Sequence, residues 1–530
     1  MFWFASVFSS FGSMIQTVGA SWLMTTLAPS ADRIALVQTA SALPFFCLSL
    51  IAGALADTYD RRVIMLVSQS VMVVGALALG VLTVLGLMSP WLLLAFTFLI
   101  GCGGAALGPA WQASIGDQVP RTMIPAAVSL NALGFNIARS VGPALGGLLV
   151  AATGAAIAFF INAVSYLGLI VAAIVWKPVR PRSALPPEPL ASAIASGLRY
   201  VRLSPPLLAI LVRCFAFTVP AAAVQALMPV VARDLLGGGA PMFGLLLGGF
   251  GVGAMLGAVF SVSIRARLSS DRLLRWLSAL LCLALIVLAL SRSPALSILA
   301  HVVAGGTWML GLTTFNIGTQ MSSPRWVVGR TVATYQTITF GGVALGSWLW
   351  GIVAHGLGLP TALGAAAAAA LISILLSRSF RVSKPVSEGL DPFAAEPVPE
   401  PKVDLDDASG PIVLTIEYRV ALSDATEFSQ VIIELGRIRR RDGAREWSIC
   451  QDIDDPEKWV ERFESPTWLD HLRRHTRPTV ADQKTRDRVA ALVASGRGTV
   501  RRYIERPPGS VPLGVNDPTA TIVGGSPGQL

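Results

Sequence analysis

Acidic residues are scarce over most of this sequence. Only 14% of its 530 residues are charged, whereas a soluble globular protein usually carries about 25%. Up to Phe380 the acidic residues are Asp32, Asp57, Asp60, Asp117, Glu188, Asp234 and Asp271, and all the others follow that position. The chain therefore has a long apolar part, which this composition excludes from being a soluble domain, and then a water-facing part.

Cysteines are few, and their positions follow no chemical pattern. Cys47, Cys102, Cys214, Cys282 and Cys450 are scattered, and four of them lie inside apolar runs. They show neither pairing nor the spacing of metal ligands, which argues against a disulfide framework and a zinc site. We expect packed, unreactive thiols, no metal and no cofactor.

Long apolar runs dominate the first part. A helix needs about 20 apolar residues to cross about 30 Å of hydrocarbon, and runs of this length satisfy their backbone in lipid as helices. The sequence therefore predicts an all-α membrane bundle of twelve transmembrane helices. The runs are Phe2–Leu27, Ile34–Ala56, Val63–Leu87, Pro90–Gly116, Met123–Ala151, Gly154–Trp176, Leu207–Ala232, Pro241–Ile264, Arg272–Leu290, Pro294–Met321, Thr331–His355 and Leu357–Ser377.

The basic residues predict the topology. Those of alternate loops include Arg61, Arg62, Arg121, Lys177, Arg265, Arg325 and Arg378, whereas the intervening loops carry only Arg33, Arg233 and Arg292. By the positive-inside rule, both termini are cytoplasmic in a multi-pass protein of the cell (inner) membrane. Because the net charge of +10 follows this topology pattern, we expect a bilayer and no nucleic acid as partner.

The bundle divides into two six-helix halves. The longest hydrophilic break separates residues 1–176 from 207–380 and forms a cytoplasmic central loop, 177–206. Trp111, Gln112 and Pro120-Arg121 recur 204 positions later as Phe315, Asn316 and Pro324-Arg325. Weak internal symmetry of this kind is typical of transporters built from two repeated halves.

The last 150 positions predict a tethered soluble domain. Residues 381–410 are rich in Pro and acid and predict a disordered linker, and residues 507–530 predict a disordered tail. Between them, 411–506 predicts an α+β ferredoxin-like domain in the order βαββαβ. Its first strand alternates, with Ile412, Leu414, Ile416 and Tyr418 on one face. A single helical stretch is predicted over Trp468–Ala494.

The most specific motif is "GALADTYDRR", Gly53 to Arg62, at the cytoplasmic end of the second run. Gly53 predicts close approach of a neighbouring helix. Asp57 lies at the negative end of the helix dipole and needs a cationic or helix-N-terminal partner, for which Arg61, Arg62 or the start of the eleventh helix is available. The string resembles the signature between helices two and three of the major facilitator superfamily, which implies a latch that holds the cytoplasmic side closed. Gly53, Asp57, Arg61 and Arg62 match that signature, and Asp60 stands where Gly is usual.

The fifth run contains "SVGPALGGLL", with Gly142, Pro143, Gly146 and Gly147. Small residues allow tight packing, and a proline bends the helix. The string resembles the glycine–proline signature associated with exporters of this superfamily. Plain helix packing is the alternative.

Residues 1–380 resemble the enterobactin-exporter-like branch, through "SSFGSMIQTVGASWLM", "ALVQTASALP" and the latch string. Behind the bundle, "RRRDGA" and "W-x-x-H-L-R-x-H" resemble a domain of the antibiotic-biosynthesis monooxygenase fold. One departure concerns the fourth run, where Thr97 precedes "GCGGAA". Drug–proton antiporters of the superfamily often have an Arg there, so its coupling role does not carry over.

Polar residues inside the runs are candidates for the substrate path. Arg139 lies about 24 Å along the fifth helix, where a guanidinium must face the bundle interior or a wet cavity. Asn136 shares its face. Arg213 is shallower and can instead snorkel to the interface. Gln112 and Asn316 complete the candidates, with an interhelical hydrogen bond as the alternative for each.

In the soluble domain, His471 and His475 are spaced to share a metal on a helix. No third ligand is visible, and Arg473 and Arg474 favour a solvated helix face.

The function that the sequence favours is a secondary active transporter that exports a siderophore, drug or secreted metabolite by alternating access, with proton coupling open. The soluble domain would then regulate, sense cargo or self-associate. The alternative is a membrane-anchored, cofactor-independent monooxygenase or regulatory protein, although no catalytic residue set supports an enzyme.

Overall fold

The computed structural model describes residues 2–118, 123–176, 190–324, 326–382, 390, 399–494, 496 and 498–506. Pro120-Arg121 of the predicted repeat, Arg325, most of the central loop, much of the linker and the tail lie outside these residues. The chain folds into two compact units. The first comprises Met1–Leu198, Pro205–Ser322 and Val328–Pro385, and the second comprises Arg199–Ser204, Ser323–Val327 and Val386–Leu530.

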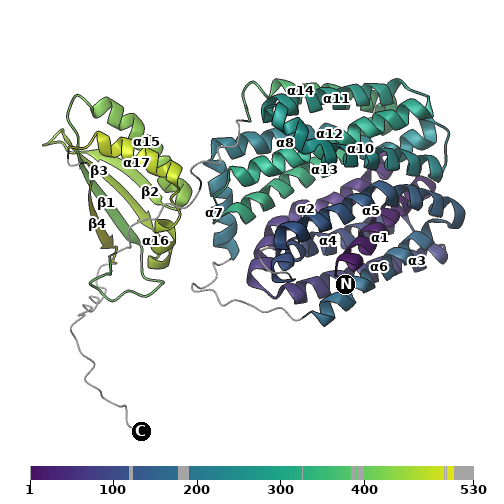
Figure 1. Cartoon of the computed structure of the whole chain (residues 1–530), viewed down its shortest axis with the longest axis horizontal. Coiled ribbons are helices and arrows are strands. Elements are labelled where there is room, and N and C mark those ends of the chain that lie inside the picture. Colours follow the sequence, from purple (N-terminus) through teal and green to yellow (C-terminus); the bar gives the residue numbers. More distant parts are fainter. Residues whose placement is uncertain are drawn as a thin grey trace, which may run out of the picture. The chain divides into compact units, whose positions relative to one another are not determined.

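The first unit is a bundle of long helices, with its two halves coloured purple to blue and teal to green in Figure 1. The first half contains α1 (Phe2–Leu27), α2 (Ala31–Thr58), α3 (Arg61–Val84), α4 (Pro90–Gln118), α5 (Ile124–Thr153) and α6 (Ala155–Val175). The second contains α8 (Pro205–Ala226), α9 (Met228–Val230), η2 (Val231–Leu235), α10 (Ala240–Arg267), α11 (Ser270–Leu290), α12 (Pro294–Met321), α13 (Val328–Leu357) and α14 (Leu359–Leu375).

The central loop contains a helix that the sequence interpretation missed. This helix, α7 (Leu190–Arg202), carries Arg199 and Arg202 in its last turn. Cations there are favourable because the unpaired carbonyls of a helix C-terminus carry negative partial charge. Helix α7 was missed because it is short and amphipathic, so its mean hydropathy is that of a hydrophilic loop.

Nine helical segments of the described residues are long and apolar enough to cross a membrane. They are Ala31–Gly53, Arg61–Val84, Pro90–Gln112, Ala155–Val175, Pro205–Leu235, Ala240–Arg267, Ser270–Leu290, Pro294–Met321 and Val328–Leu357. Val141–Thr153 and Leu359–Leu375 are shorter apolar helices. The membrane bundle is therefore confirmed, and twelve crossings stay a prediction.

Two single-residue turns support the predicted repeat. Gly154 alone separates α5 from α6, with φ 83° and ψ 170°. Gly358 alone separates α13 from α14, with φ 88° and ψ 156°. Both positions lie in the left-handed region, where glycine is strongly favoured, and they are 204 positions apart, the offset of the predicted repeat. The same turn thus occurs before the last helix of each half.

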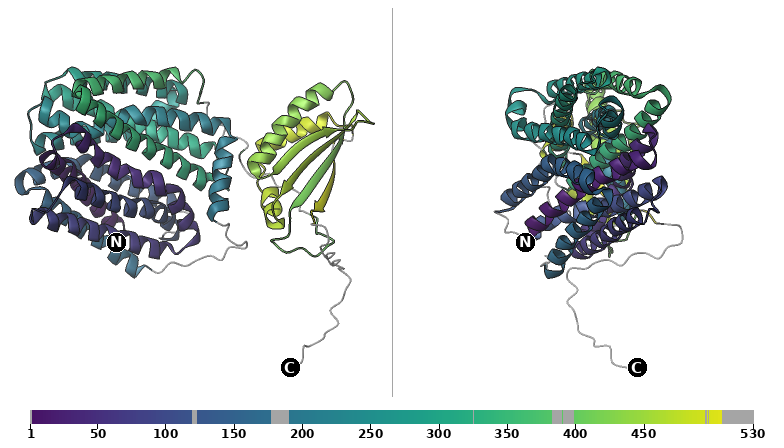
Figure 2. Two further views of the ribbon diagram at one scale, coloured as in Figure 1. Left: turned by 180° about the vertical axis from the view of Figure 1, so that it is seen from behind. Right: turned by 90° about the vertical axis from the view of Figure 1, so that its right-hand side faces the viewer.

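The soluble part of the second unit is a four-stranded sheet with helices on one face (Figure 2). Its elements are β1 (Ile412–Arg419), α15 (Ala425–Asp442), β2 (Arg445–Gln451), β3 (Lys458–Ser465), α16 (Trp468–His475), α17 (Val480–Ala491) and β4 (Thr499–Ile504). The strand order is β2-β3-β1-β4, and all neighbours are antiparallel. This arrangement is compatible with the predicted ferredoxin-like order.

The alternation predicted for β1 holds. Ile412 is 2% exposed and Leu414, Ile416 and Tyr418 are each 6% exposed, and all four belong to the core between sheet and helices. The side-chain period of two in a strand places them on one face.

Two predictions for this region are wrong. The helical stretch Trp468–Ala494 is two helices, because residues 476–479, which include Pro478, separate α16 from α17, and a proline does not fit a helix interior. The end of the predicted disordered linker is ordered. The Ser409 carbonyl accepts from Trp468 N at 2.7 Å, and the Asp407 carbonyl accepts from Leu469 N at 3.1 Å.

Candidate functional site

The latch segment joins three helix ends. Asp60 is the N-cap of α3, and its carboxylate accepts from Arg62 N at 2.9 Å. Arg61 Nε donates to the carbonyl of Ala56 at 3.4 Å, and Arg62 Nη2 donates to that of Ile174 at 2.6 Å. The two arginines therefore place positive charge at the carbonyl ends of α2 and α6.

The other two residues of the latch motif are Asp57 and Gly53. The side chain of Asp57 lies outside the described part of the chain, so its predicted pairing stays a prediction. A methyl group at Gly53 would lie 3.7 Å from Ala333 Cβ, an ordinary van der Waals contact. Helix α13 therefore lies against α2 at Gly53, with room for a methyl group there, so packing does not require glycine at this position.

The glycines of the helix-five motif do mark close approaches. A Cβ on Gly142 would lie 2.8 Å from Met14 Cβ, and one on Gly146 would lie 3.1 Å from Ile15 Cα, both on α1. A Cβ on Gly147 would lie 2.6 Å from Gly244 Cα on α10. One face of the motif thus packs within the first half, and Gly147 packs against the second half.

A matching set of glycines lies in α13, and the sequence interpretation missed it. Gly351 follows Gly147 by 204 positions, and its Cβ would lie 2.6 Å from Ala35 Cβ on α2. Gly346 follows Gly142 by the same offset and approaches Ala222 of α8. Applying the 204-residue offset to the helix-five motif would have found both. Each half therefore uses its fifth helix to contact the other half, along α5 with α10 and α13 with α2.

At one end of the bundle, polar side chains join the two halves. Arg233 of η2 donates to the Pro29 carbonyl at 2.8 Å and lies 3.5 Å from that of Thr25, at the end of α1. His355 Nδ1, at the end of α13, lies 3.6 Å from the carboxylate of Asp32 in the first turn of α2. Trp22 and Phe243 stack with ring centroids 6.4 Å apart. At this end of the bundle the two halves are therefore in direct contact.

The residues predicted for the substrate path differ in exposure and in hydrogen bonding. Gln112 is exposed, and Asn316 is half-buried and accepts a hydrogen bond from Gln320. The side chains of Asn136 and Arg139 on α5 are outside the described part. Their place in the path therefore stays a prediction.

Arg213 has a defined partner. It is 1% exposed, and its Nη1 lies 2.9 Å from Asp271 Oδ1 and 3.5 Å from the Phe380 carbonyl. Asp271 also pairs with Arg275 at 3.3 Å. The guanidinium of Arg213 therefore extends to helix ends without reaching water, and an ion pair that joins α8 to α11 accounts for its burial.

Gln16 and Asn162 are two further amides inside the apolar runs, and their side chains bind each other. Asn162 Nδ2 donates to Gln16 Oε1 at 2.6 Å and to Tyr166 Oη at 2.9 Å, and all three side chains are buried. An amide that is buried in a membrane bundle needs such a partner. This network holds α1 to α6.

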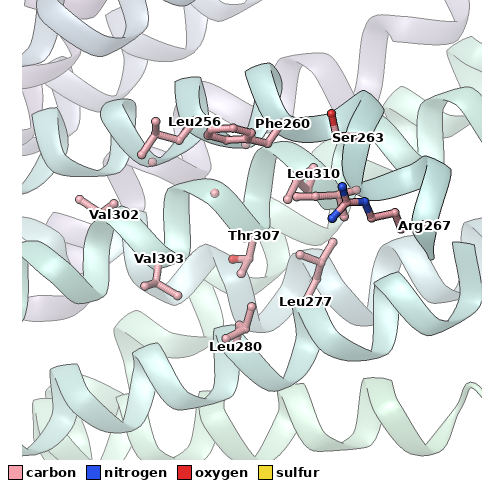
Figure 3. Close-up of a pocket in the computed structure, with 14 residues that line it drawn as sticks. Leu256, Phe260, Ser263, Arg267, Leu277, Leu280, Val302, Val303, Thr307 and Leu310 are labelled. Atoms are coloured by element: carbon pink, nitrogen blue, oxygen red, sulfur yellow. The ribbon is translucent and has the colours of Figure 1, made fainter. Parts of the chain in front are cut away.

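A groove of about 730 Å³ lies on the second half (Figure 3). Leu256 and Phe260 of α10, Leu277 and Leu280 of α11, and Val303 of α12 are among its lining residues. Its lining is mostly apolar, and Phe260 is 54% exposed. Because every lining residue belongs to one half, this groove does not lie between the halves and brings together none of the predicted path residues.

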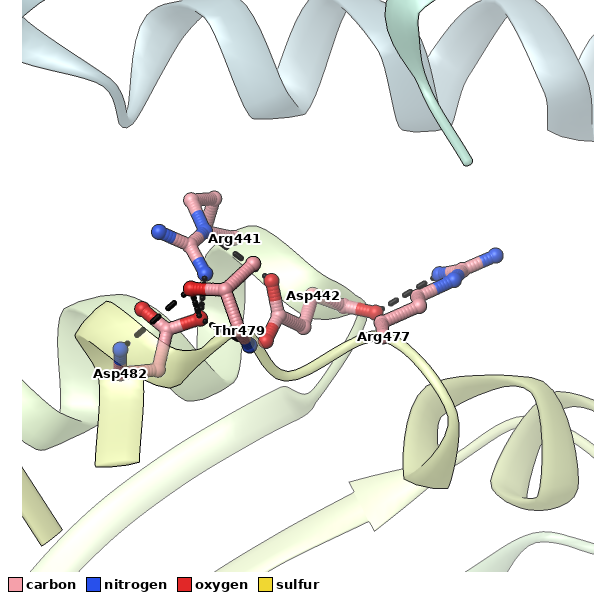
Figure 4. Close-up of polar contacts among 5 residues, drawn as sticks. All are labelled: Arg441, Asp442, Arg477, Thr479 and Asp482. Atoms are coloured by element: carbon pink, nitrogen blue, oxygen red, sulfur yellow. Dashed lines mark hydrogen bonds and ion pairs between the residues drawn. The ribbon is translucent and has the colours of Figure 1, made fainter. Parts of the chain in front are cut away.

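The soluble domain has a buried polar network (Figure 4). Arg441 Nη2 binds Asp482 at 2.7 Å, and Arg441 Nε binds Asp442 at 3.0 Å. Arg477 donates to the Asp442 carbonyl at 2.7 Å. Thr479 caps α17 in a reciprocal capping box with Asp482. The network fixes the end of α15 to the start of α17.

The predicted solvated face of α16 is wrong. His471 is 2% exposed and Arg474 is 8% exposed, and Arg474 lies over the Phe463 ring at 4.5 Å. Among the described residues no group of three or more His, Cys, Asp or Glu side chains is arranged to hold a metal ion.

Comparison with known proteins agrees with this architecture. The Multidrug efflux pump Tap of Mycobacterium tuberculosis (strain ATCC 25618 / H37Rv) is 29% identical over 209 residues, 37% of this chain and 49% of the pump, so the chain spans about half the length of that relative. The Staphyloferrin A transporter of Staphylococcus aureus (strain NCTC 8325 / PS 47) is 32% identical over 168 residues, 31% of this chain and 42% of that protein. Both relatives are transporters rather than enzymes.

The fold is also that of known transporters. A bacterial homologue of the human lysosomal transporter Spinster, solved in an inward-facing and unoccupied conformation, matches with a TM-score of 0.54 and 16% identity, over 72% of this chain and 96% of that one. A family model described as "Transmembrane secretion effector" matches residues 1–508. With both its bundle and its soluble domain inside that match, the chain belongs to the transmembrane secretion effector family of MFS-type membrane transporters.

Proposed function

We propose that this chain exports a small molecule from the cytoplasm by alternating access. In this proposal α1–α6, α8 and α10–α14 make twelve crossings of the inner membrane, and both termini are cytoplasmic. The observation that carries the proposal is the pair of symmetry-related crossings, Gly147 on Gly244 and Gly351 on Ala35. Halves that meet through small residues can rock about a site near the midplane without unpacking large side chains.

The polar contacts between the halves at one end of the bundle support the same proposal. Under the predicted topology, the contacts of Arg233 with α1 and the pair of Asp32 with His355 lie on the extracellular side. The side chain of His355 is 62% exposed, and exposed polar pairs of this kind stabilise by only about 0–1 kcal/mol. Such contacts can close one side and break during each cycle.

The direction of transport is proposed from the relatives, one named as an efflux pump and one as a siderophore transporter. We propose a siderophore, drug or secreted metabolite as cargo, and the charged residues of the bundle favour an anionic or neutral molecule over a cation. The acidic residues of the bundle lie at helix ends or in the central loop, so a lipophilic cation would lack a membrane-embedded carboxylate. Asp271 neutralises Arg213, so the preference for anionic cargo is proposed from the positive charge of Arg139.

The helix–helix contact of Gly147 with Gly244 is tested with Gly147→Val and a matched glycine variant. In everted membrane vesicles we expect the wild type to accumulate cargo when the membrane is energised and to lose it when the ion gradients are collapsed. Gly147→Val should fold but lose most accumulation, because its side chain would meet the backbone of Gly244. Gly364→Val is the control, since a Cβ at Gly364 meets nothing within 4 Å. Equal transport by both variants at matched expression would refute the proposed role of the crossing.

The charge of the cargo is tested separately. Efflux of an anionic and a cationic amphiphile of similar size is compared in wild type and Arg139→Gln. We expect the anion to be the better substrate and the variant to export it several-fold more slowly. A preference for the cation, together with unchanged anion efflux in Arg139→Gln, contradicts the assignment.

A further inference from the structure

The soluble domain contains a cavity of about 230 Å³ between its sheet and its helices. Apolar side chains from the sheet line one part of it, including Leu414, Ile416 and Phe463. Arg439 of α15, Arg474 of α16 and Arg486 of α17 line the other part. Three guanidinium groups therefore converge on one small, half-apolar space.

Carboxylates of the domain neutralise one of these arginines. Glu461 is 0% exposed and lies 3.4 Å from Arg439 Nε. It also accepts from Tyr418 Oη and Trp447 Nε1, at 2.8 Å each. Asp442, the acidic residue that lines the cavity, pairs with Arg441. The carboxylates of Glu461 and Asp442 near the cavity therefore already pair with Arg439 and Arg441.

Within the described residues, neither Arg474 nor Arg486 forms a direct ion pair of this kind, and Asp442 and Glu461 act on them only from a greater distance. In the part of the domain that the structure describes, Nε of Arg474 and Nε of Arg486 are buried without a hydrogen-bond partner. Burial, aided by Arg439, lowers the pKa of Arg474 to about 9. Burial and Arg439 also lower the pKa of Arg486 to about 10. Asp442 and Glu461 offset only part of this effect on the pKa of either group. A buried cation whose charge is only partly compensated is costly, so both groups gain from an anion.

His471 supplies a further donor. Arg474 Nη2 lies 3.2 Å from His471 Nδ1, and a guanidinium can only donate. Nδ1 is therefore the acceptor, and the proton of the neutral ring sits on Nε2. That Nε2–H is buried and has no partner within the described residues. Arg439 Nε also lacks a hydrogen-bond partner, so each unsatisfied group here, on Arg439, Arg474, Arg486 and His471, is a donor.

We propose that this cavity binds a small organic carboxylate with an apolar body. A carboxylate accepts several hydrogen bonds in the fork geometry that arginine offers. The apolar lining from Leu414, Ile416 and Phe463 favours a hydrocarbon body over an inorganic ion. At about 30 Å³ for each water, the cavity has the volume of about eight waters, which suits a single substituted ring or a short branched acid.

The proposal is tested on the purified full-length protein by titration calorimetry with benzoate as probe. Benzamide has nearly the same shape without the charge, and inorganic phosphate has charge without the apolar body. We expect saturable benzoate binding, with benzamide and phosphate each weaker by roughly tenfold or more. Equal binding of benzoate and benzamide, no benzoate binding at millimolar concentration, or tighter binding of phosphate would overturn the assignment.

Variants locate the site. Arg474→Gln and Arg486→Gln should each weaken benzoate binding by roughly tenfold or more. Arg488→Gln, two positions along α17 from Arg486 and 58% exposed, should leave it unchanged. Circular dichroism and thermal unfolding confirm folding, and Arg486→Gln keeps the test valid if the more buried Arg474 variant unfolds. Benzoate binding that survives in a folded Arg486→Gln protein places the site elsewhere and refutes the proposal.

Discussion

Arg213 and Asp271 form an ion pair of 2.9 Å that joins the middle of α8 to the first turn of α11. The arginine is 1% exposed and the carboxylate 20% exposed, so water screens the pair poorly. Removal of one partner leaves an uncompensated buried charge. The pair is therefore a structural element of the second half.

Asp271→Asn should destabilise the bundle markedly. Breaking a buried pair by removing one partner costs about 3–5 kcal/mol, and the partial exposure of Asp271 places the expected loss near the lower value. Thermal unfolding in detergent measures it. Arg275→Gln removes the 48% exposed partner of the same carboxylate and should cost only about 0–1 kcal/mol. Equal losses in the two variants would contradict the assignment of Arg213 as the main partner.

Asp57→Asn should impair transport while membrane insertion stays normal, because the change removes the latch charge and almost no volume. Vesicle accumulation at matched expression measures the effect. Asp60→Asn is the control, since Asn also caps helices well and Asp60 caps α3. Transport that is unchanged in Asp57→Asn would show that this segment is not a latch.

A chain that ends at Lys384 should still insert and transport. The bundle unit extends to Pro385, so this truncation removes the soluble domain and leaves the helices of the bundle intact. Efflux and membrane level are measured against the full chain. Loss of all efflux at a normal membrane level would make the domain obligatory for transport.

The soluble domain should lose stability as the pH falls from 7 to 5. Burial, followed by the charges of Arg474, Arg502 and His475, lowers the pKa of His471 to about 3, against about 6.5 in the unfolded chain. The unfolded state then binds more protons over this range, so stability is complete above pH 6.5 and decreases as the pH falls. The loss at pH 5 is about 2 kcal/mol.

Denaturant unfolding followed by tryptophan fluorescence measures this loss in the full chain. His471→Gln keeps a polar side chain and cannot ionise in this range. Its stability should change less between pH 7 and pH 5 than that of the wild type. A slope that is identical in the two proteins would exclude His471 as the source.

Much of the architecture follows from the sequence because its signals are local. Apolar length determines which segments can be membrane helices, and the 204-residue offset between Trp111 and Phe315 predicts the repeat that the turns at Gly154 and Gly358 support in the structure. In the soluble domain, the alternation from Ile412 to Tyr418 predicts the buried face of β1, since the period of two is a property of the strand itself.

Tertiary structure decided what depends on partners distant in the chain. Arg213 has the sequence context of a snorkelling residue, and only the approach of α11 makes Asp271 its counter-ion. The spacing of His471, Arg474 and His475 is the same on a wet helix and on a buried one. The burial of His471 and Arg474 is decided by the sheet beneath α16, and the break at Pro478 brings Arg486 of α17 to the same cavity. Charge compensation acts through space, and a one-dimensional pattern carries no distances between elements.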